Sequence, residues 1–173
     1  MAISFYDASV GRYLQTISAV QGFLDKGRAH CQEAGLNPSD LVETRLYADM
    51  FPLRFQIQSV AHHSIGAIEG MKSGVFGPPS NLAQLDYAGL QGLIADTRAA
   101  LEKLTPDAVN ALESRELAFE ARGMKMPFTA QGFLLSFSLP NFYFHAATAY
   151  DVLRSKGVPL GKRDFMGALL LKQ

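Results

Sequence analysis

The sequence has very little cysteine and no excess of charge of either sign. Cys31 is the single cysteine of the 173 residues, which excludes an internal disulfide and favours a reducing compartment. Lysine and arginine total 16, as do aspartate and glutamate, so no basic excess attracts nucleic acid or anionic lipid. The first residues lack the charged and apolar regions of a signal peptide. We expect one cytoplasmic domain over residues 1–173, with no nucleic-acid and no membrane partner.

The common catalytic signatures are also missing. The sequence contains no GxGxxG, Walker loop, GxSxG, HExxH or CxxC motif, and no internal repeat. Cys31 follows no clear pattern of positive neighbours, and its position near a helix end favours an inert small residue. The residues alone therefore do not name an activity, and the most unusual feature of the sequence is one uncharged stretch.

That stretch runs from Met126 to Tyr150 without any Asp, Glu, Lys or Arg. Its length would suit a membrane span. Proline, glycine and polar residues, among them Pro140 and His145, interrupt it, and such groups are costly in hydrocarbon. We therefore expect a buried helix with a kink or break at Pro140.

Hydrophobic periodicity and capping residues predict four long helices and a hairpin. Ser4 and Asp7 suit a helix start, and Gly35 suits its end. The expected elements are helices over about 5–34, 51–72, 87–104 and 129–156, a short helix or turn over 41–47, and a β-hairpin over 115–128 with Pro127 on its edge. The fold class is all-α, a four-helix bundle with a short β-hairpin before the last helix.

The histidines are the remaining candidates for functional residues. On a helical projection of the second helix, His62 and His63 lie on the two flanks of the core stripe, so neither is expected to be a simple core residue. His145 of the fourth helix could meet one of them across a bundle, and Asn141 stands one turn before it. Two histidines and an amide make a poor zinc site, and nothing places Asp49 or Glu69 nearby. A hydrogen-bonded buried histidine, a metal site and an apolar ligand pocket all remain open.

The segments Leu139–Arg154 and Gly157–Phe165, together with Phe5–Val10 and Asp49–Leu53, resemble an uncharacterised domain-of-unknown-function family. That family lies within the DinB-like, YfiT-like superfamily of metal-dependent four-helix bundles. The resemblance implies an up-down-down-up bundle that is often dimeric. It also implies a divalent transition metal such as nickel or zinc, held by one histidine of the second helix and an HxxxH pair of the fourth.

Carried onto this sequence, the implied metal ligands are His62, or its neighbour His63, together with Asn141 and His145. Asn141 replaces the first histidine of the pair, which removes a strong ligand. One hypothesis is a metal-dependent enzyme of the transferase or hydrolase type. The other is a non-catalytic homodimeric bundle that binds a small apolar ligand or a protein partner. Phe142, Tyr143 and Phe144 would contribute to the contact or pocket, and Phe144 is expected to point outward.

Overall fold

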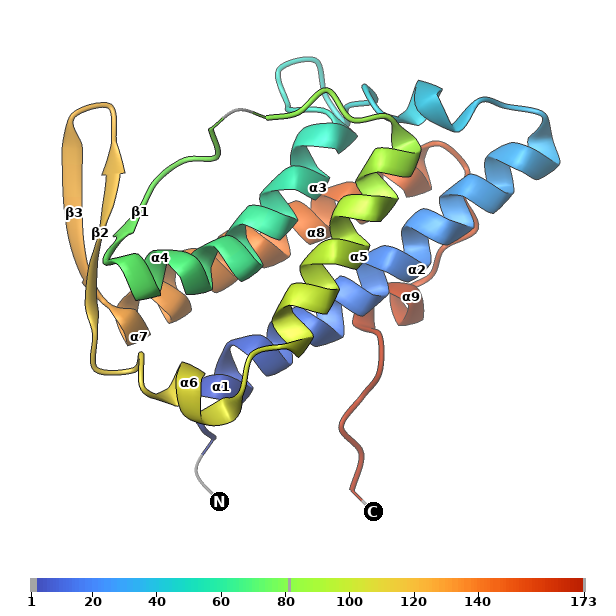
Figure 1. The fold of residues 1–173 in the computed structure, drawn as a ribbon. Coiled ribbons are helices and arrows are strands. Elements are labelled where there is room, and N and C mark those ends of the chain that lie inside the picture. Colours follow the sequence, from blue (N-terminus) through green and yellow to red (C-terminus); the bar gives the residue numbers. More distant parts are fainter. Residues whose placement is uncertain (1–2, 81, 173) are drawn as a thin grey trace.

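The computed structural model describes residues 3–80 and 82–172 and is mostly helical, with a small three-stranded sheet (Figure 1). Two of its long helices are single segments, and two pass through a π-helical turn. The segments are α2 (Val10–Ala34), α3 (Leu53–Ala61) continuing through the π-helical turn His62–Gly66 into α4 (Ala67–Ser73), α5 (Tyr87–Glu102), and α7 (Ala130–Phe133) continuing through the π-helical turn Leu134–Ser138 into α8 (Leu139–Ser155). The shorter elements are α1 (Phe5–Ala8), a 3₁₀ turn (Pro38–Leu41), α6 (Pro106–Asn110), α9 (Lys162–Met166) and strands β1 (Val75–Phe76), β2 (Glu116–Ala121) and β3 (Met124–Thr129).

Local capping chemistry sets most helix ends, as predicted. Ser4 and Asp7 form a reciprocal capping box, and Gly35 ends α2 in the left-handed conformation with φ 67°. Asp86 and Thr129 accept backbone N–H groups at the starts of α5 and α7. The first helix is interrupted at Ser9, however, where the backbone leaves helical geometry at ψ −84°.

The connection between the first two long helices agrees with one of the two predicted alternatives, and the expectation for the fourth helix needs correction. A 3₁₀ turn at Pro38–Leu41 begins earlier than expected, because Asn37 caps it and the proline occupies its first turn. A turn follows at residues 42–43, so the expected turn over 41–47 is present and a helix is not. Pro140 does not break the fourth helix. The missing proline N–H falls at the second residue of α8, in the first turn after the π-helical turn Leu134–Ser138, and the helix continues to Ser155.

The predicted hairpin is present, and it belongs to a larger sheet than expected. Strands β2 and β3 pair antiparallel through a two-residue turn in which Arg122 has φ 50° and Gly123 has φ 80°. Pro127 lies on the edge strand β3, as its missing N–H requires. The strand β1 pairs with β2 in parallel, with Val75 opposite Ala118. The protein is therefore mostly helical with a small sheet, rather than all-α.

The long helices pack along their apolar faces (Figure 1). In that view, α2 and α7–α8 run in one direction and α3–α4 and α5 in the other. Helix α3 packs on α8, α2 packs on α5, and α9 lies against α2. The apolar faces of the second and fourth helices are buried, apart from Tyr150, which is half-buried. Their fully buried members are Leu53, Ile57, Val60, Ser64, Ile68, Met71, Phe142, Ala146, Ala149 and Leu153.

Among the described residues, no helix combines the length and the apolar character that crossing a membrane would require. The uncharged stretch from Met126 to Tyr150 is divided between the end of β3, α7, the π-helical turn and most of α8. The interpretation of this stretch as a helix is thus confirmed from Ala130 onward, whereas its burial is confirmed for one face only, because Leu135, Tyr143 and Phe144 are exposed.

Candidate functional site

The two π-helical turns meet at the seam between α3–α4 and α7–α8. The Ser138 hydroxyl donates to the His63 carbonyl oxygen at 2.8 Å and lies 2.7 Å from the Tyr13 hydroxyl. A π-helical turn leaves a backbone carbonyl off the regular ladder, and such turns are frequent at functional sites. Here the contact joins the turn of one helix to the turn of the other and fixes their relative height.

This contact brings three histidines together, which we call the histidine cluster: His62, His63 and His145. The His62 and His63 ring centroids are 5.3 Å apart, and those of His63 and His145 are 5.7 Å apart with nearly parallel planes at 18°. The prediction that His145 meets a histidine of the second helix is confirmed. His63 is the member that stacks directly on it.

His63 is buried, with 6 % of its surface exposed. The prediction that it lies outside the core is wrong, because Phe76 and Phe137 cover that flank of the helix, with ring centroids 5.5 and 5.9 Å away. Its Nδ1 has no hydrogen-bond partner among the described residues. A buried polar atom without a partner is uncommon, and it singles out this ring within the cluster.

Gln56 fixes the tautomer of His145. The Gln56 side-chain nitrogen donates to the Phe51 carbonyl oxygen at 2.8 Å, so the amide oxygen faces His145 Nδ1 at 2.7 Å. An amide oxygen only accepts, and Nδ1 must therefore carry the hydrogen. His145 Nε2 is left with a lone pair. The sequence did not reveal this role, since the pattern does not distinguish Gln56 from its neighbour Gln58.

The tautomer of His62 is fixed in the same way, by the backbone carbonyl group of Gly77. Its Nε2 lies 2.8 Å from the Gly77 carbonyl oxygen, so Nε2 carries the hydrogen and Nδ1 holds the lone pair. The ring stacks on Phe76 with centroids 4.5 Å apart, and a Cβ placed on Gly66 would lie 3.4 Å from Nδ1. The lone pair of His62 is therefore directed along its own helix, over Gly66.

All three histidines are neutral near pH 7. Burial, with smaller effects of His62 and His145, lowers the pKa of His63 to about 3. Burial, with a smaller effect of His62, lowers the pKa of His145 to about 4. Burial also lowers the pKa of His62, despite the opposing hydrogen bond to Gly77. The cluster therefore offers uncharged imidazoles, which accept hydrogen bonds or bind metal ions.

The donors near the cluster do not fit a closed transition-metal centre. In the described part of the chain, His, Cys, Asp and Glu nowhere form a group of three or more that could hold an ion. Asn141 contributes at most a neutral amide oxygen, because its nitrogen donates to the Phe137 carbonyl oxygen at 2.7 Å. Glu69 pairs with Lys72 at 2.8 Å. The assignment of metal ligands to His62, Asn141 and His145 stays a prediction.

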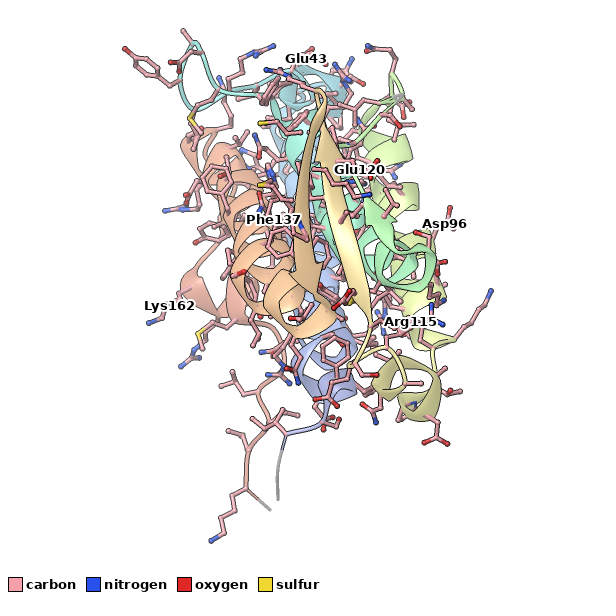
Figure 2. All side chains as sticks on the ribbon, turned by 90° about the vertical axis from the view of Figure 1, so that its left-hand side faces the viewer. Glu43, Asp96, Arg115, Glu120, Phe137 and Lys162 are labelled. Atoms are coloured by element: carbon pink, nitrogen blue, oxygen red, sulfur yellow. The ribbon has the colours of Figure 1, made fainter. Side chains whose placement is uncertain are left out.

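Aromatic rings enclose the cluster on its inner side. Phe76 packs against His62 and His63 and also against Phe133, at 5.1 Å between ring centroids. Phe137 contacts Phe119 of the hairpin at 4.9 Å, and Figure 2 shows Phe137 beside the hairpin, on the side of the orange helix. The hairpin thus covers one end of the cluster with apolar side chains.

On its outer side, the cluster reaches the surface through a second set of rings, which we call the aromatic face: Phe51, Phe55, Phe144 and His145. Phe51 stacks on Phe55 at 4.0 Å, and Phe55 and Phe144 meet the His145 ring edge-on at 5.8 and 5.3 Å. Phe51 and Phe144 are 59 % and 58 % exposed. The prediction that Phe144 points outward is confirmed, and it does so beside a neutral imidazole.

Comparisons with known proteins agree with this fold. No curated protein matches the chain. The crystal structure of a DinB family member protein from Shewanella denitrificans superposes with a TM-score of 0.78 at 24% sequence identity, over 97% of this chain and 94% of that one. At this identity the likeness shows a shared fold. The family model described as "Domain of unknown function (DUF1993)" matches residues 5–166, and the chain therefore belongs to this family.

Proposed function

We propose that this protein is a binding protein, folded as a four-helix bundle of the up-down-down-up type, whose aromatic face holds a small apolar ligand. The ligand carries an aromatic ring and an uncharged hydrogen-bond donor, as a phenol does. The observation that supports this proposal is the neutral His145 ring between Phe55 and Phe144, with Gln56 holding the hydrogen on Nδ1.

The chemistry of the face selects this class of ligand. His145 Nε2 accepts but does not donate, because the tautomer is fixed and burial keeps the ring neutral. A charged donor would lose its hydration among the rings of Phe51, Phe55 and Phe144. An aromatic body packs well against such rings in edge-on or offset geometry. A phenolic hydroxyl satisfies both requirements.

Phenol and anisole form a matched pair for the test, because anisole keeps the ring and lacks the donor. We expect phenol to shift backbone amide resonances of α3 and α8 and to bind about tenfold more tightly than anisole, the worth of one hydrogen bond in an apolar site. In His145→Phe, both compounds should bind equally. Circular dichroism serves to verify that the variant is folded.

Two results would count against the proposal. One is equal binding of phenol and anisole to the wild-type protein. The other is a set of shifted resonances that excludes α3 and α8. Gln56→Leu provides a further check, because it releases the tautomer of His145. It also removes the hydrogen bond to the Phe51 carbonyl oxygen, so it should weaken phenol binding more than anisole binding.

A metal-dependent enzyme of the transferase or hydrolase type is the second candidate. It is favoured by one observation, that His62 and His145 each anchor one ring nitrogen on an oxygen acceptor, as metal-binding histidines do. The test is the nickel and zinc content of protein purified without an affinity tag. Less than about a tenth of an equivalent, unchanged in His145→Ala, would eliminate this candidate.

A further inference from the structure

The loop that leads into α3 carries the most exposed tyrosine of the described residues. Tyr47 is 70 % exposed, whereas Tyr13 and Tyr87 are buried and their hydroxyls are hydrogen-bonded in the core. Figure 1 shows this loop above the start of α3. We call residues 45–50 the tyrosine loop. A tyrosine side chain is a phenol, so the chain itself carries the chemistry of the ligand proposed for the aromatic face.

The two ends of the tyrosine loop are fixed to each other. The Leu53 N–H donates to the Thr44 carbonyl oxygen at 2.9 Å, and the Arg54 N–H donates to the Val42 carbonyl oxygen at 3.0 Å. Leu53 and Val42 are themselves buried in the core. The loop therefore has a fixed base at the start of α3, and motion is confined to the residues between these anchors.

The tip of the loop is held by contacts at the surface. The Met50 N–H donates to the Tyr47 carbonyl oxygen at 3.1 Å and closes a four-residue turn, and the Arg45 guanidinium donates to the Met50 carbonyl oxygen at 2.7 Å. Both Arg45 and Tyr47 are exposed. Hydrogen bonds in such a position exchange readily with water, so the tip opens at little cost in free energy.

The base of the loop adjoins His145. The Gln56 amide joins the Phe51 carbonyl oxygen, at 2.8 Å, to His145 Nδ1, at 2.7 Å. With the bond lengths of an amide added, the Phe51 oxygen lies within about 8 Å of the imidazole. The four residues from Phe51 back to Tyr47 span up to about 13 Å, and the tyrosine side chain adds its own length. The Tyr47 hydroxyl can therefore reach the imidazole while the base of the loop stays in place.

The surroundings of His145 favour this contact. Its Nε2 has a lone pair and no hydrogen, so it accepts from a hydroxyl group. Phe55 and Phe144 meet the imidazole edge-on at 5.8 and 5.3 Å, and a tyrosine ring packs against such rings in the same geometry. Closure would also remove part of Phe144 from water, and this side chain is 58 % exposed.

We propose that the tyrosine loop closes over the aromatic face, so that the Tyr47 hydroxyl donates to His145 Nε2 and the loop competes with an external phenol for the site. The structure describes the open form, in which Tyr47 lies in solvent. A ligand binds this form alone, so its apparent affinity is reduced by the fraction of molecules that are closed. The inference rests on the proposed function, because it assigns to Tyr47 the same site and the same hydrogen bond.

Titration of phenol and anisole into the wild-type protein and Tyr47→Phe, followed by NMR, measures the competition. One hydrogen bond favours the closed form by roughly two- to tenfold, so Tyr47→Phe should bind phenol more tightly by about that factor. Anisole should gain the same factor, because the loop blocks the site for both compounds. Arg45→Ala frees the tip of the loop and should weaken the binding of both. Tyr6→Phe on α1, at the other end of the molecule in Figure 1, is the matched control and should bind as wild type.

Nuclear Overhauser contacts from the Tyr47 ring to the rings of Phe144 and His145 detect the closed form without a ligand. They should be present in the wild-type protein, and saturating phenol should remove them. The absence of these contacts, or equal phenol binding by the wild-type protein and Tyr47→Phe, overturns the inference and leaves the proposed function intact. Contacts that are present while neither protein binds phenol overturn the proposed function and retain the closure of the loop.

Discussion

Acidification from about pH 7.5 to about pH 5 should lower the free energy of unfolding by about 4 kcal/mol through the histidine cluster. Burial holds the pKa of His63 at about 3 and that of His145 at about 4, whereas an exposed histidine titrates near 6.5. Because the folded values are the lower ones, the unfolded chain binds more protons below about pH 6.5. Stability is therefore complete above that pH and decreases as the pH falls toward the folded values.

The magnitude follows from the two pKa values. At about pH 5 an unfolded histidine is almost fully protonated and the buried rings are almost fully neutral, which costs about 2 kcal/mol for each ring. Two rings lose about 4 kcal/mol, a large part of the 5–15 kcal/mol (roughly) that keeps a domain of ordinary stability folded. Carboxylates contribute little in this interval, since they titrate below it.

Urea unfolding at a series of pH values, followed by circular dichroism, measures this loss. His63→Gln removes one of the two titrating rings, so the decrease should shrink to about 2 kcal/mol. The dependence should persist in about 0.5 M salt, because desolvation causes it and salt screens only exposed charges. The reasoning fails if the wild-type decrease is below about 0.5 kcal/mol, or if His63→Gln retains all of it.

Two further changes test the contact between α2 and α5 and the turn of the hairpin. Gly27→Ala should cost about 1–3 kcal/mol in urea unfolding, because its methyl group would overlap the Tyr87 hydroxyl that donates to the Leu24 carbonyl oxygen. The penalty should be smaller in a Tyr87→Phe background, and equal penalties would contradict the steric cause. Arg122→Asn should stabilise the hairpin by about 0.5 kcal/mol, seen as a higher melting temperature, because asparagine tolerates the left-handed φ of 50° better. An unchanged or lower melting temperature would count against this.

The helices could be predicted from the sequence because their ends depend on neighbours in the chain. The capping side chains of Ser4, Asp86 and Thr129 lie within three residues of the N–H groups that they accept. The strand β1 could not be predicted in this way. Its two residues pair with β2 across more than forty positions, Val75 with Ala118, and two residues carry no periodicity.

For the candidate site, the sequence predicted which two helices contribute histidines, and it did not predict which side chains contact each other. Facing helices of a bundle bring inward histidines together, which is why His145 was expected to meet the second helix. The choice of His63 as the stacking partner depends on Phe76 and Phe137, whose positions follow from the hairpin and the π-helical turn. The role of Gln56 depends on its distance from α8, which no local pattern contains.

Asn141 also has a structural role that does not involve a ligand. In an α-helix, the Phe137 carbonyl oxygen would accept the backbone N–H four residues later, and the π-helical turn Leu134–Ser138 disturbs that ladder. The Asn141 side chain donates to this carbonyl oxygen at 2.7 Å. Asn141, which replaces the first histidine of the two-histidine pattern, thus supports the π-helical turn. That π-helical turn places Ser138 against His63.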